Sequence, residues 1–305
     1  MSIVILGIFV ADTVYRGARL PKMGETVLGS GFFLGPGGKG SNQAVAAAQA
    51  GGQVRFLTRL GVDAFADMAR EIWGRAGVTA DVIEDADSYT GAAMVFLQDG
   101  TGANAILVAP GAASRITPAD LERWSPAIRA ARVFVTQLEQ PIDAALRGLQ
   151  IARAAGAMTI LNPAPFGDLP PGMLGLCDLV TPNESEAEGL TGIAVTGVDS
   201  AAAAAAVLQA QGARAVVVTL GGQGALYQDA ARTLHVPARS LGPVADTTGA
   251  GDAFNGGLAT ALAEGQTIDQ ALHFATAVAA LSVTKPGTAA SMPTRDQIAA
   301  VLVRS

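Results

Sequence analysis

Short apolar runs that alternate with helical segments constrain the fold of this chain more than any other feature. From Thr117 onward the apolar runs fall at residues 132–136, 158–162, 178–181 and 215–220, with a helical segment between successive runs. Strands separated by helices pair in parallel, because each helix carries the chain back to the edge of the sheet where the strand began. We therefore predict an α/β fold with a mostly parallel central sheet and helices on both of its faces.

The N-terminal part of the chain adds to this sheet. Residues 3–7 are wholly apolar, as is typical of a strand buried on both faces, and residues 54–60 predict another strand. The alanine-rich residues 41–50 predict a helix between these strands, and residues 65–76 predict a helix after them. These elements extend the same alternation toward the N-terminus.

Two stretches, residues 12–34 and 90–109, alternate only weakly and resemble partly exposed β-hairpins. The strands expected within them are 26–28, 30–34, 90–97 and 104–109. A small sheet folded over the main sheet as a lid would account for both stretches, and its open edges favour pairing with a second copy of the chain. We expect one domain over residues 1–305 with this lid, and a homodimer formed through it.

Composition excludes several classes of function. The formal net charge of the 305 residues is −6 and no run of basic residues occurs, which argues against nucleic acid and anionic membrane as partners. With one cysteine, Cys177, and two histidines, neither a disulfide framework nor a His/Cys metal site is expected. The chain starts without a positively charged leader, and no apolar stretch reaches about 18 residues without turn signals. We therefore expect a cytoplasmic protein with no membrane span.

The stretch 246–252, which reads DTTGAGD, carries the most chemistry and leads into an alanine-rich helix. Backbone N–H groups of residues 249–251 would be unpaired at the start of that helix, where they favour an anion. Asp252 adds a carboxylate, so the stretch could deprotonate a hydroxyl while steadying a transferring phosphoryl group. Alternatively, Asp252 only interacts favourably with the helix dipole, which is worth roughly 0.3–1 kcal/mol.

A glycine-rich turn, GPGGKG at residues 35–40, comes before a predicted helix. It has the form G-x-G-x-x-G, but the dinucleotide fingerprint needs that turn directly after the first buried strand, which ends near Gly7. A P-loop needs Ser or Thr after Gly-Lys, and here Gly40 follows Lys39. Lys39 and Asn42 remain as donors for a polyhydroxylated ligand. Alternatively, the glycines serve only backbone geometry and Lys39 is solvated.

Polar residues also follow predicted strands further along the chain. Asn183 and Glu186 have the spacing of a capping box, and they could also hold a hydrated Mg²⁺ beside a triphosphate. Glu139 lies just past a buried strand, where parallel sheets bind ligands, so it is either a ligand contact or part of a solvated rim. The glycine turn 221–224 after Thr219 is either a plain loop or the approach to a nucleotide.

Four motifs, in order along the chain, carry a resemblance to a known family. They are GGKGSNQA at residues 37–44, NPAP at 162–165, TPNE at 181–184 with Glu186, and the stretch 246–256. In these motifs, and over nearly all of its length, the chain resembles the ribokinase family of sugar kinases, of the phosphofructokinase-B type. The resemblance implies a three-layer αβα sandwich with a mostly parallel central sheet and a small β-sheet lid.

The resemblance also implies a role for each motif residue. Asp252 would be the general base, beside an anion hole formed by Gly249, Ala250 and Gly251. The residues implied in sugar binding are Asp12, Gly38, Lys39, Gly40, Asn42, Glu139 and Asp252. The residues implied in binding ATP and Mg²⁺ are Asn183, Glu186, Thr219, Gly221, Gly224, Gly251 and Thr276. A monovalent cation, K⁺, is implied next to the anion hole, mostly on backbone carbonyls, at Asp246, Thr248, Ser282, Lys285, Gly287 and Ser291.

One position departs from the family pattern. The first sugar-binding segment of the family reads G-x-x-N-x-D, whereas this chain has Val10 at the asparagine position. A lost hydrogen-bonding pair costs about 1–3 kcal/mol when one partner is left buried. The resemblance implies an ATP-dependent kinase for the primary 5-hydroxyl of D-ribose, giving D-ribose 5-phosphate. A kinase for another sugar, such as a pentose lacking one hydroxyl, or for a nucleoside is the alternative, and a non-catalytic sugar-binding regulator is a third reading.

Overall fold

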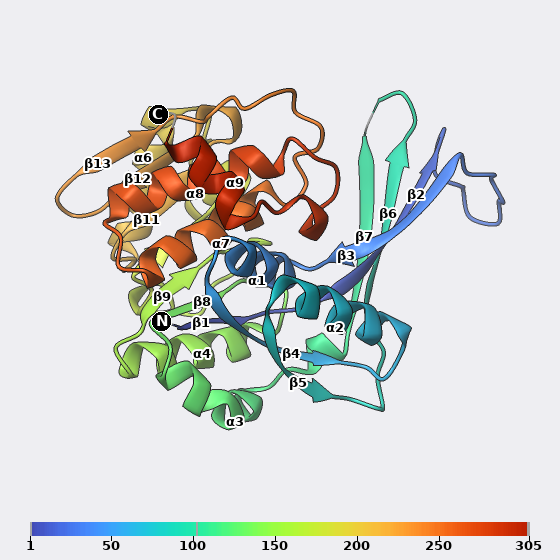
Figure 1. The fold of residues 1–305 in the computed structure, drawn as a ribbon, viewed down its shortest axis with the longest axis horizontal. Coiled ribbons are helices and arrows are strands. Elements are labelled where there is room, and N and C mark those ends of the chain that lie inside the picture. Colours follow the sequence, from blue (N-terminus) through green and yellow to red (C-terminus); the bar gives the residue numbers. More distant parts are fainter. Residues whose placement is uncertain (1, 102, 304–305) are drawn as a thin grey trace.

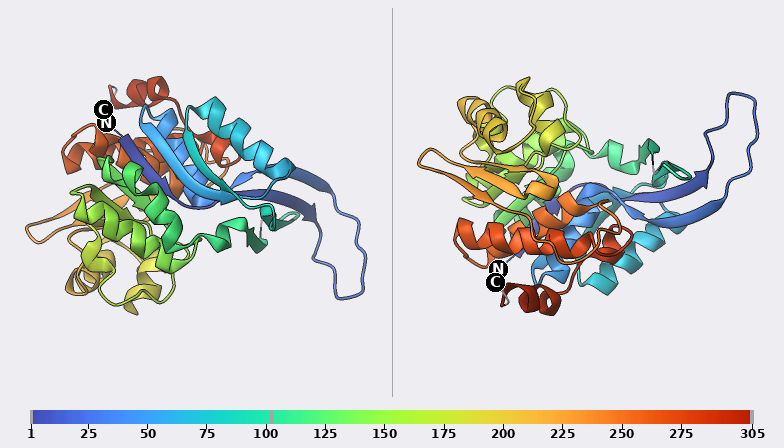
Figure 2. Two further views of the ribbon diagram at one scale, coloured as in Figure 1. Left: turned by 90° about the horizontal axis from the view of Figure 1, so that it is seen from below. Right: turned by 90° about the horizontal axis from the view of Figure 1, so that it is seen from above.

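A computed structural model describes residues 2–101 and 103–303 of the chain. A large sheet lies between two layers of helices, and a small sheet extends from one side of this body (Figure 1). Two further views show the helices on both sides of the large sheet, and a long loop reaching outward from the small sheet (Figure 2). The predicted three-layer αβα architecture with an additional small sheet is confirmed.

The large sheet is mostly parallel, as predicted. Its strands are β1 (Ser2–Leu6), β4 (Gln53–Leu60), β5 (Thr79–Glu84), β8 (Val133–Thr136), β9 (Met158–Leu161), β10 (Leu179–Val180), β11 (Val216–Thr219), β12 (Ala225–Gln228) and β13 (Thr233–Val236). Within the described residues their order is β13-β12-β11-β10-β9-β8-β1-β4-β5. The antiparallel pairs in this order are β11–β12 and β12–β13, so antiparallel pairing is confined to one edge.

Strand β1 illustrates how both faces of this sheet are buried. Ile3 and Ile5 pack into one cluster of core residues, whereas Val4 and Leu6 point to the opposite face and pack into a second cluster. The helices of the first cluster are α1 (Lys39–Gln49), α2 (Ala64–Ala76), α7 (Ala250–Ala263), α8 (Ile268–Ser282) and α9 (Arg295–Leu302). Those of the second are α3 (Pro118–Arg129), α4 (Ile142–Ala154), α5 (Glu184–Thr191) and α6 (Val198–Ala210).

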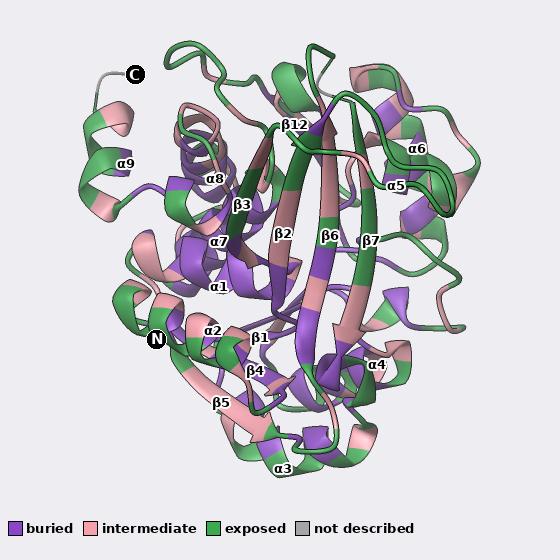
Figure 3. Cartoon of the chain, turned by 90° about the vertical axis from the view of Figure 1, so that its right-hand side faces the viewer, coloured by how far each residue is buried: buried purple, intermediate pink, exposed green. Residues whose placement is uncertain are grey.

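The small sheet contains β2 (Val10–Gly17), β3 (Gly31–Gly37), β6 (Thr90–Gln98) and β7 (Asn104–Gly111), in the order β3-β2-β6-β7. Strands β2 and β3 form one antiparallel pair and β6 and β7 form another, so both predicted hairpins are confirmed. The two hairpins join through parallel pairing of β2 with β6. Figure 3 shows the exposed residues along β3 and β7, with the buried residues of β2 and β6 at the end near the large sheet.

The predicted strand at residues 26–28 is wrong. These residues lie in the loop between β2 and β3, and the first strand of that hairpin is β2 instead. Residues Thr26–Leu28 have side chains that favour strands, but Leu28 is 92% exposed. No neighbouring strand or core surface therefore stabilises an extended conformation there. The sequence pattern of β2 predicts a strand poorly, because Asp12, Thr13 and Arg16 interrupt its apolar residues.

Besides β2, three strands were not predicted, all of them in the large sheet: β5, β12 and β13. Strands β5 and β13 lie at the two edges of the large sheet, and both contain partly exposed residues. Edge strands lack the continuous apolar run of a strand buried on both faces, so their pattern is weak. The buried central strands were predicted to within one or two residues at each end.

Short 3₁₀ helices occupy four loops of the described chain: η1 (Ala112–Arg115), η2 (Leu174–Leu176), η3 (Gly221–Gln223) and η4 (Ala289–Ser291). Among the helices described, none has both the length and the apolar character that crossing a membrane requires.

Candidate active site

A cleft of about 140 Å³ opens where the parallel strands of the large sheet end. Its lining comes from the segments that follow β9 and β10, from the last residue of β11, from the turn before α7, and from the first turns of α1, α5 and α7. This carboxyl edge is where open α/β sheets bind ligands. The predicted site residues that line the cleft are Lys39, Asn183, Glu186, Thr219, Gly249, Ala250, Gly251 and Asp252.

Helix α7 begins at this cleft without a side-chain cap. Gly249 precedes it with a φ of 78°, a left-handed conformation that glycine adopts without strain. The prediction that Ala250 has a free N–H group is wrong, because this group closes the preceding turn by donating to the Thr247 carbonyl over 3.1 Å. The N–H groups of Gly251 and Asp252 have no hydrogen-bond partner in the described part of the chain. These donors and the positive end of the helix dipole therefore favour an anion.

Asp252 lies at the start of α7 and is only 7% exposed. Its Oδ2 accepts a hydrogen bond from Asn42 Nδ2 over 3.0 Å, and its Oδ1 accepts one from Gln43 Nε2 over 3.1 Å. Burial raises the pKa of this carboxyl, against the opposing effects of the Lys39 charge and the two amide donors. A carboxylate with a raised pKa is a stronger proton acceptor, as general-base catalysis requires.

Lys39 lies among several carboxylates. Glu139 Oε2 accepts a hydrogen bond from the Lys39 backbone N–H over 2.8 Å, which joins the loop after β8 to the start of α1. Burial alone would lower the pKa of the Lys39 ammonium, but the nearby negative charges outweigh it and raise the pKa, Asp252 most strongly. The ammonium group thus stays charged at neutral pH in a cleft lined with acids.

The carboxyls of Asp12 and Glu139 are shifted toward neutral pH. Burial raises the pKa of Glu139 to about 7, with smaller contributions from Asp252 and Asp12 and an opposing effect of Lys39. Burial also raises the pKa of Asp12 to about 6, and the charge of Asp252 adds to this effect. Polar groups that are this poorly hydrated are suited to binding sugar hydroxyls, which replace the lost water contacts.

Gly38 and Gly40 bring the first turn of α1 against the segment between β1 and β2. Gly38 has a φ of 88°, and a Cβ atom there would lie 2.5 Å from the Ile8 carbonyl oxygen. A Cβ atom on Gly40 would lie 2.7 Å from the Cα atom of Gly7. Backbone geometry therefore requires glycine at both positions, which does not exclude a ligand contact there, and Asn42 in the same turn lies next to Asp252.

Asn183 and Glu186 form the predicted capping box of α5. Asn183 Oδ1 accepts from the Glu186 N–H over 2.8 Å, and Glu186 Oε2 accepts from the Asn183 N–H over 2.9 Å. Burial raises the pKa of Glu186, partly offset by the hydrogen bond from Asn183. Both residues also line the cleft, so capping and ligand binding do not exclude each other.

The remaining nucleotide-site predictions lie outside the cleft lining. Gly221 and Gly224 flank the turn of η3 after β11, with φ values of 48° and 95°. Thr276 is buried in α8, and its hydroxyl has no hydrogen-bond partner in the described residues. Thr219, in contrast to these three residues, ends β11 and lines the cleft.

Asp246 joins the two loops predicted to hold a monovalent cation. Its Oδ1 accepts from the Thr248 N–H over 2.9 Å, and its Oδ2 accepts from the Gly287 N–H over 3.0 Å. Burial would raise the pKa of Asp246, but hydrogen bonds from Thr248 and Gly287 outweigh it and lower the pKa. Asp246 is thus a charged brace between the loops, and its carboxylate oxygens are already occupied.

The other residues predicted for the cation site differ in their surroundings. The Ser282 and Ser291 hydroxyls bond back to the carbonyls of Ala279 and Thr288. Lys285 is exposed. In the described residues, no cluster of three or more His, Cys, Asp or Glu side chains could hold a metal ion.

Several buried polar side chains around the cleft had no predicted role: Gln43, Gln137, Asn162, Thr181 and Asn255. Gln43, Asn162, Thr181 and Asn255 stand inside the motifs on which the family resemblance rests. The sequence signal was therefore present, but which side chain contacts which could not be read from spacing. Val10 is buried against the core with 4% of its surface exposed.

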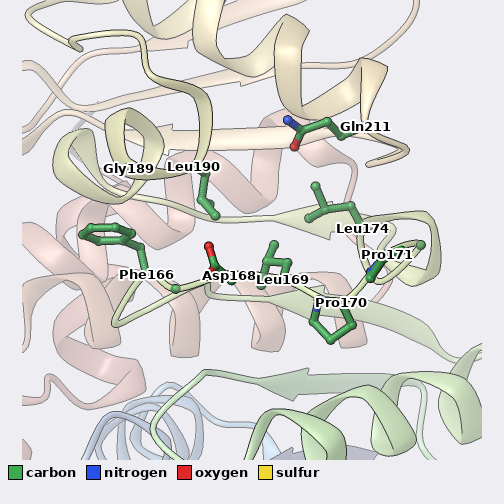
Figure 4. A pocket seen from close by; sticks show the side chains of 11 residues that line it. Phe166, Asp168, Leu169, Pro170, Pro171, Leu174, Gly189, Leu190 and Gln211 are labelled. Atoms are coloured by element: carbon green, nitrogen blue, oxygen red, sulfur yellow. The ribbon is translucent and has the colours of Figure 1, made fainter.

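A larger cavity of about 430 Å³ lies outside the cleft. Phe166, Asp168 and Leu169 line it from the loop after β9, and Leu190 lines it from the end of α5 (Figure 4). None of the predicted site residues lines this cavity.

Residues 1–295 match the family model described as pfkB family carbohydrate kinase. The chain is 36% identical over 298 residues to the ribokinase of Haemophilus influenzae, covering 97% of this chain and 96% of that protein. It is 35% identical over 299 residues to the deoxyribokinase of Salmonella typhimurium, covering 97% of each.

The fold is also similar to solved structures. Arabidopsis thaliana ribokinase, solved in complex with ribose and ATP, superposes with a TM-score of 0.92 at 32% identity, covering 98% of each chain. A ribokinase from Thermotoga maritima superposes with a TM-score of 0.89 at 31% identity, covering 99% of each chain. These matches extend over both the large sheet and the small sheet.

Proposed function

The chain belongs to the pfkB family of carbohydrate kinases, and on that premise we propose that it transfers the γ-phosphoryl group of ATP to the primary 5-hydroxyl of D-ribose. The product is D-ribose 5-phosphate. The observation that carries the proposal is one juxtaposition: the Asp252 carboxylate lies at the uncapped N-terminus of α7, in the same cleft as Lys39.

In the proposed reaction, Asp252 takes the proton from the sugar hydroxyl as the oxygen attacks the γ-phosphorus. A bond forms between this oxygen and the phosphorus, while the bond from the phosphorus to the β–γ bridging oxygen breaks, and ADP leaves with that oxygen. Negative charge on the transferring group faces the N–H groups of Gly251 and Asp252, which are fixed before the reaction starts. Lys39 adds a positive charge to the same cleft.

The sugar would lie among Asp12, Gly38, Lys39, Asn42 and Glu139. Asn42 supports this placement because its Oδ1 is buried without a partner in the described residues, while its Nδ2 is used on Asp252. A buried acceptor of this kind costs free energy until a ligand hydroxyl donates to it.

Mg²⁺ would be held through water by Asn183 and Glu186. The capping box uses Oε2 of Glu186, so Oε1 remains available to a metal-bound water. When bound, Mg²⁺ neutralises charge on the phosphate oxygens. The nucleotide would extend from there past Thr219 toward Gly221, Gly224 and Thr276, where the Thr276 hydroxyl lacks a partner among the described residues.

A K⁺ ion bound by the loops that Asp246 joins is part of the proposal. Backbone carbonyls are suitable ligands for K⁺, and these loops offer carbonyls but no carboxylate oxygen that is free of hydrogen bonds. The test compares initial rates in K⁺ and in Na⁺ at constant ionic strength. Faster turnover in K⁺ supports the site, and equal rates contradict it.

A second candidate substrate is 2-deoxy-D-ribose. Val10 and Asp12 lie two residues apart on β2, so their side chains share a face of the sheet, and Val10 brings no hydrogen-bonding group there. A pocket without that polar partner discriminates weakly against a sugar that lacks one hydroxyl. The relative in Salmonella typhimurium that is named a deoxyribokinase favours the same candidate.

We also propose that the whole chain acts as one kinase domain and that the small sheet is its lid and its dimer interface. The sheet face opposite Asp12 exposes apolar side chains from all four strands of the small sheet: Tyr15, Phe32, Leu34, Met94 and Leu107. Exposed apolar faces and open edges on a small sheet favour pairing with a second copy. Light scattering should give twice 30.7 kDa, and Phe32→Glu should reduce it to one chain. A wild-type monomer would contradict this interface.

ATP consumption with a panel of acceptors tests the proposed function. The panel contains D-ribose, 2-deoxy-D-ribose, D-fructose and adenosine, and ³¹P NMR identifies the phosphorylated position. We expect the highest kcat/KM with D-ribose and phosphate on the 5-oxygen. A higher value with 2-deoxy-D-ribose would favour the second candidate, and no turnover above the acceptor-free rate would reject a sugar kinase. Localisation in the cytoplasm stays a prediction.

Val10→Asn separates the two candidate sugars. Restoring an amide at this position should increase the preference for D-ribose over 2-deoxy-D-ribose by about 10-fold, the effect of one hydrogen bond to a substrate hydroxyl. An unchanged ratio would mean that Val10 does not contact the sugar.

A further inference from the structure

A chain of buried side-chain hydrogen bonds leads from the loop after β8 to Asp252. Gln137 Nε2 donates to Gln43 Oε1 over 2.6 Å. The two protons of Gln43 Nε2 go to Asp252 Oδ1 over 3.1 Å and to Asn162 Oδ1 over 3.0 Å. Every hydrogen-bonding group of the Gln43 amide is therefore used, and its orientation is fixed by its neighbours.

A second arm of the same network reaches the residue before Asp252. Asn162 Nδ2 donates to the Thr181 carbonyl over 2.8 Å, and the Thr181 hydroxyl donates to Asn255 Oδ1 over 2.7 Å. Asn255 Nδ2 then donates to the Gly251 carbonyl over 2.9 Å. The network thus contacts two adjacent residues of α7 from two sides, with one consistent donor direction along each arm.

Burying these polar side chains costs free energy, so packing alone does not explain why they are there. Gln43 and Gln137 are fully buried, and Asn162, Thr181 and Asn255 are each at most 6% exposed. Buried amides cost free energy unless every group is paired, and apolar side chains of similar size would fill the same space more cheaply. These five side chains lie where α1 and the segments at the ends of β8, β9 and β10 meet the start of α7.

We propose that Gln43, held in place by Gln137 and Asn162, is a positioning residue that fixes the orientation of the Asp252 carboxylate relative to the N–H groups at the start of α7. The inference rests on the proposed kinase function and adds a role for residues outside the sugar and nucleotide contacts. Gln43 acts through Asp252 and touches neither substrate.

Gln43 also affects the proton affinity of Asp252. Its hydrogen bond favours the ionised form, so losing it raises the pKa of Asp252 further. The charged groups that face Asp252 are the same with and without Gln43: Lys39 from α1, Asp12 from β2, Glu139 from the loop after β8, and Glu186 from α5. A change in the pH profile on replacing Gln43 therefore reports the lost hydrogen bond.

The test is the pH profile of kcat for Gln43→Met at saturating sugar and ATP. Methionine has about the same length and no donor, so the core keeps its volume. We expect the acid limb of the profile to move up by about 1 pH unit, the effect of one hydrogen bond to a charged group. At pH values below the acid limb, the kcat of Gln43→Met should therefore be about 10-fold lower than that of the wild type.

Gln140→Met is the matched control. Gln140 is a buried amide of the same loop that donates to the Thr136 hydroxyl and the Gln137 carbonyl, with no bond to Asp252 or Gln43. We expect it to lower the thermal midpoint without moving the acid limb. If Gln43→Met does not fold, Gln43→Glu keeps the shape of the side chain and places a second carboxyl at Asp252, which should also move the limb upward.

Failure of this inference differs from failure of the proposed function. A wild type that phosphorylates no sugar overturns both. An active wild type whose acid limb stays in place in the Gln43 variants, or moves equally in Gln140→Met, overturns only the positioning role.

Discussion

Helices α5 and α7 both begin at the cleft, but their N-termini are built in opposite ways. Helix α5 is closed by its own capping box, in which Asn183 and Glu186 satisfy each other's backbone N–H groups. Helix α7 has a left-handed glycine before its first residue and no side-chain cap. The comparison teaches that a capped N-terminus uses its donors for the fold, whereas an uncapped one keeps them for a ligand.

The packing of α7 explains how it tolerates an open end. A missing N-cap costs about 1 kcal/mol, and α7 offsets this through close contact with α1 and α8. A Cβ atom on Gly256 would lie 2.6 Å from the Ala46 Cβ, and one on Gly257 would lie 2.8 Å from a Val278 methyl group. Tight helix packing thus stabilises the element that carries the reactive carboxylate.

The largest expected effect comes from Asp252→Asn. Turnover should fall at least about 100-fold, the low end for removing a general base, while the variant folds normally. Asp199→Asn is the matched control, because Asp199 also lies in the first turn of a helix, α6, and is exposed. If a carboxylate in the first turn of α7 served only the dipole, the two variants would behave alike, and near-normal kcat in Asp252→Asn would remove the basis of the comparison.

A smaller kinetic effect should distinguish the two glycines of the open N-terminus. A Cβ atom on Gly251 meets nothing within 4 Å, so Gly251→Ala should fold with an unchanged thermal midpoint. Its methyl group should still displace the phosphoryl group and lower kcat between about 10- and 100-fold. Gly249→Ala should instead lose about 1 kcal/mol or more of stability, because Gly249 has a φ of 78°. The reverse pattern would mean that α7 does not receive the phosphoryl group.

The pH dependence of stability tests the acids around Lys39. The pKa of Glu139 is about 7 in the folded protein, above its usual value, so the protonated form favours folding. This contribution is complete below about pH 4.5 and is lost as the pH rises through 7. Between pH 5 and 8 the free energy of unfolding without ligands should fall about 2 kcal/mol more in the wild type than in Glu139→Gln.

Urea unfolding at the two pH values measures this difference, and Glu122→Gln is its control. Glu122 is an exposed acid on α3 that pairs with Arg147, so removing its charge should change the pH dependence little. Equal pH dependence in wild type and Glu139→Gln would show that Glu139 is hydrated and ionised throughout.

The smallest expected effect on activity comes from changing the capped N-terminus of α5. Asn183→Ala should cost about 1 kcal/mol of stability, and Thr294→Ala should cost about the same, because Thr294 forms the capping box of α9. Only Asn183→Ala should also raise the Mg²⁺ concentration needed for half-maximal activity. If the two variants show the same Mg²⁺ dependence, α5 is a structural helix that merely borders the cleft.

The sequence predicted the two N-termini unequally well. The capping box of α5 follows from residue type and spacing alone, and it formed as expected. The start of α7 was also placed correctly, but the turn bond from Ala250 to Thr247 depends on backbone angles that spacing does not specify. The role of Gln43 was not predicted, because its partners Gln137 and Asn162 come from distant parts of the chain.

The same contrast holds for the two sheets. Strand β8 is buried on both faces, so its apolar run alone predicts it. Strand β2 in the small sheet is partly exposed and carries Asp12 and Arg16, so its position depends on pairing with β3 and β6. The buried parallel strands of the large sheet are thus readable from sequence, whereas β2, which carries a predicted ligand contact and reaches solvent, requires the structure.

The most direct test of the open N-terminus is a crystal structure with ADP, Mg²⁺, D-ribose and aluminium fluoride, which mimics the transferring phosphoryl group. We predict the fluoroaluminate within about 3 Å of the Gly251 N–H, with an Asp252 carboxylate oxygen within about 3 Å of the sugar 5-hydroxyl. A fluoroaluminate bound elsewhere, with the start of α7 facing only water, or an Asp252 carboxylate remote from the sugar, would contradict the account.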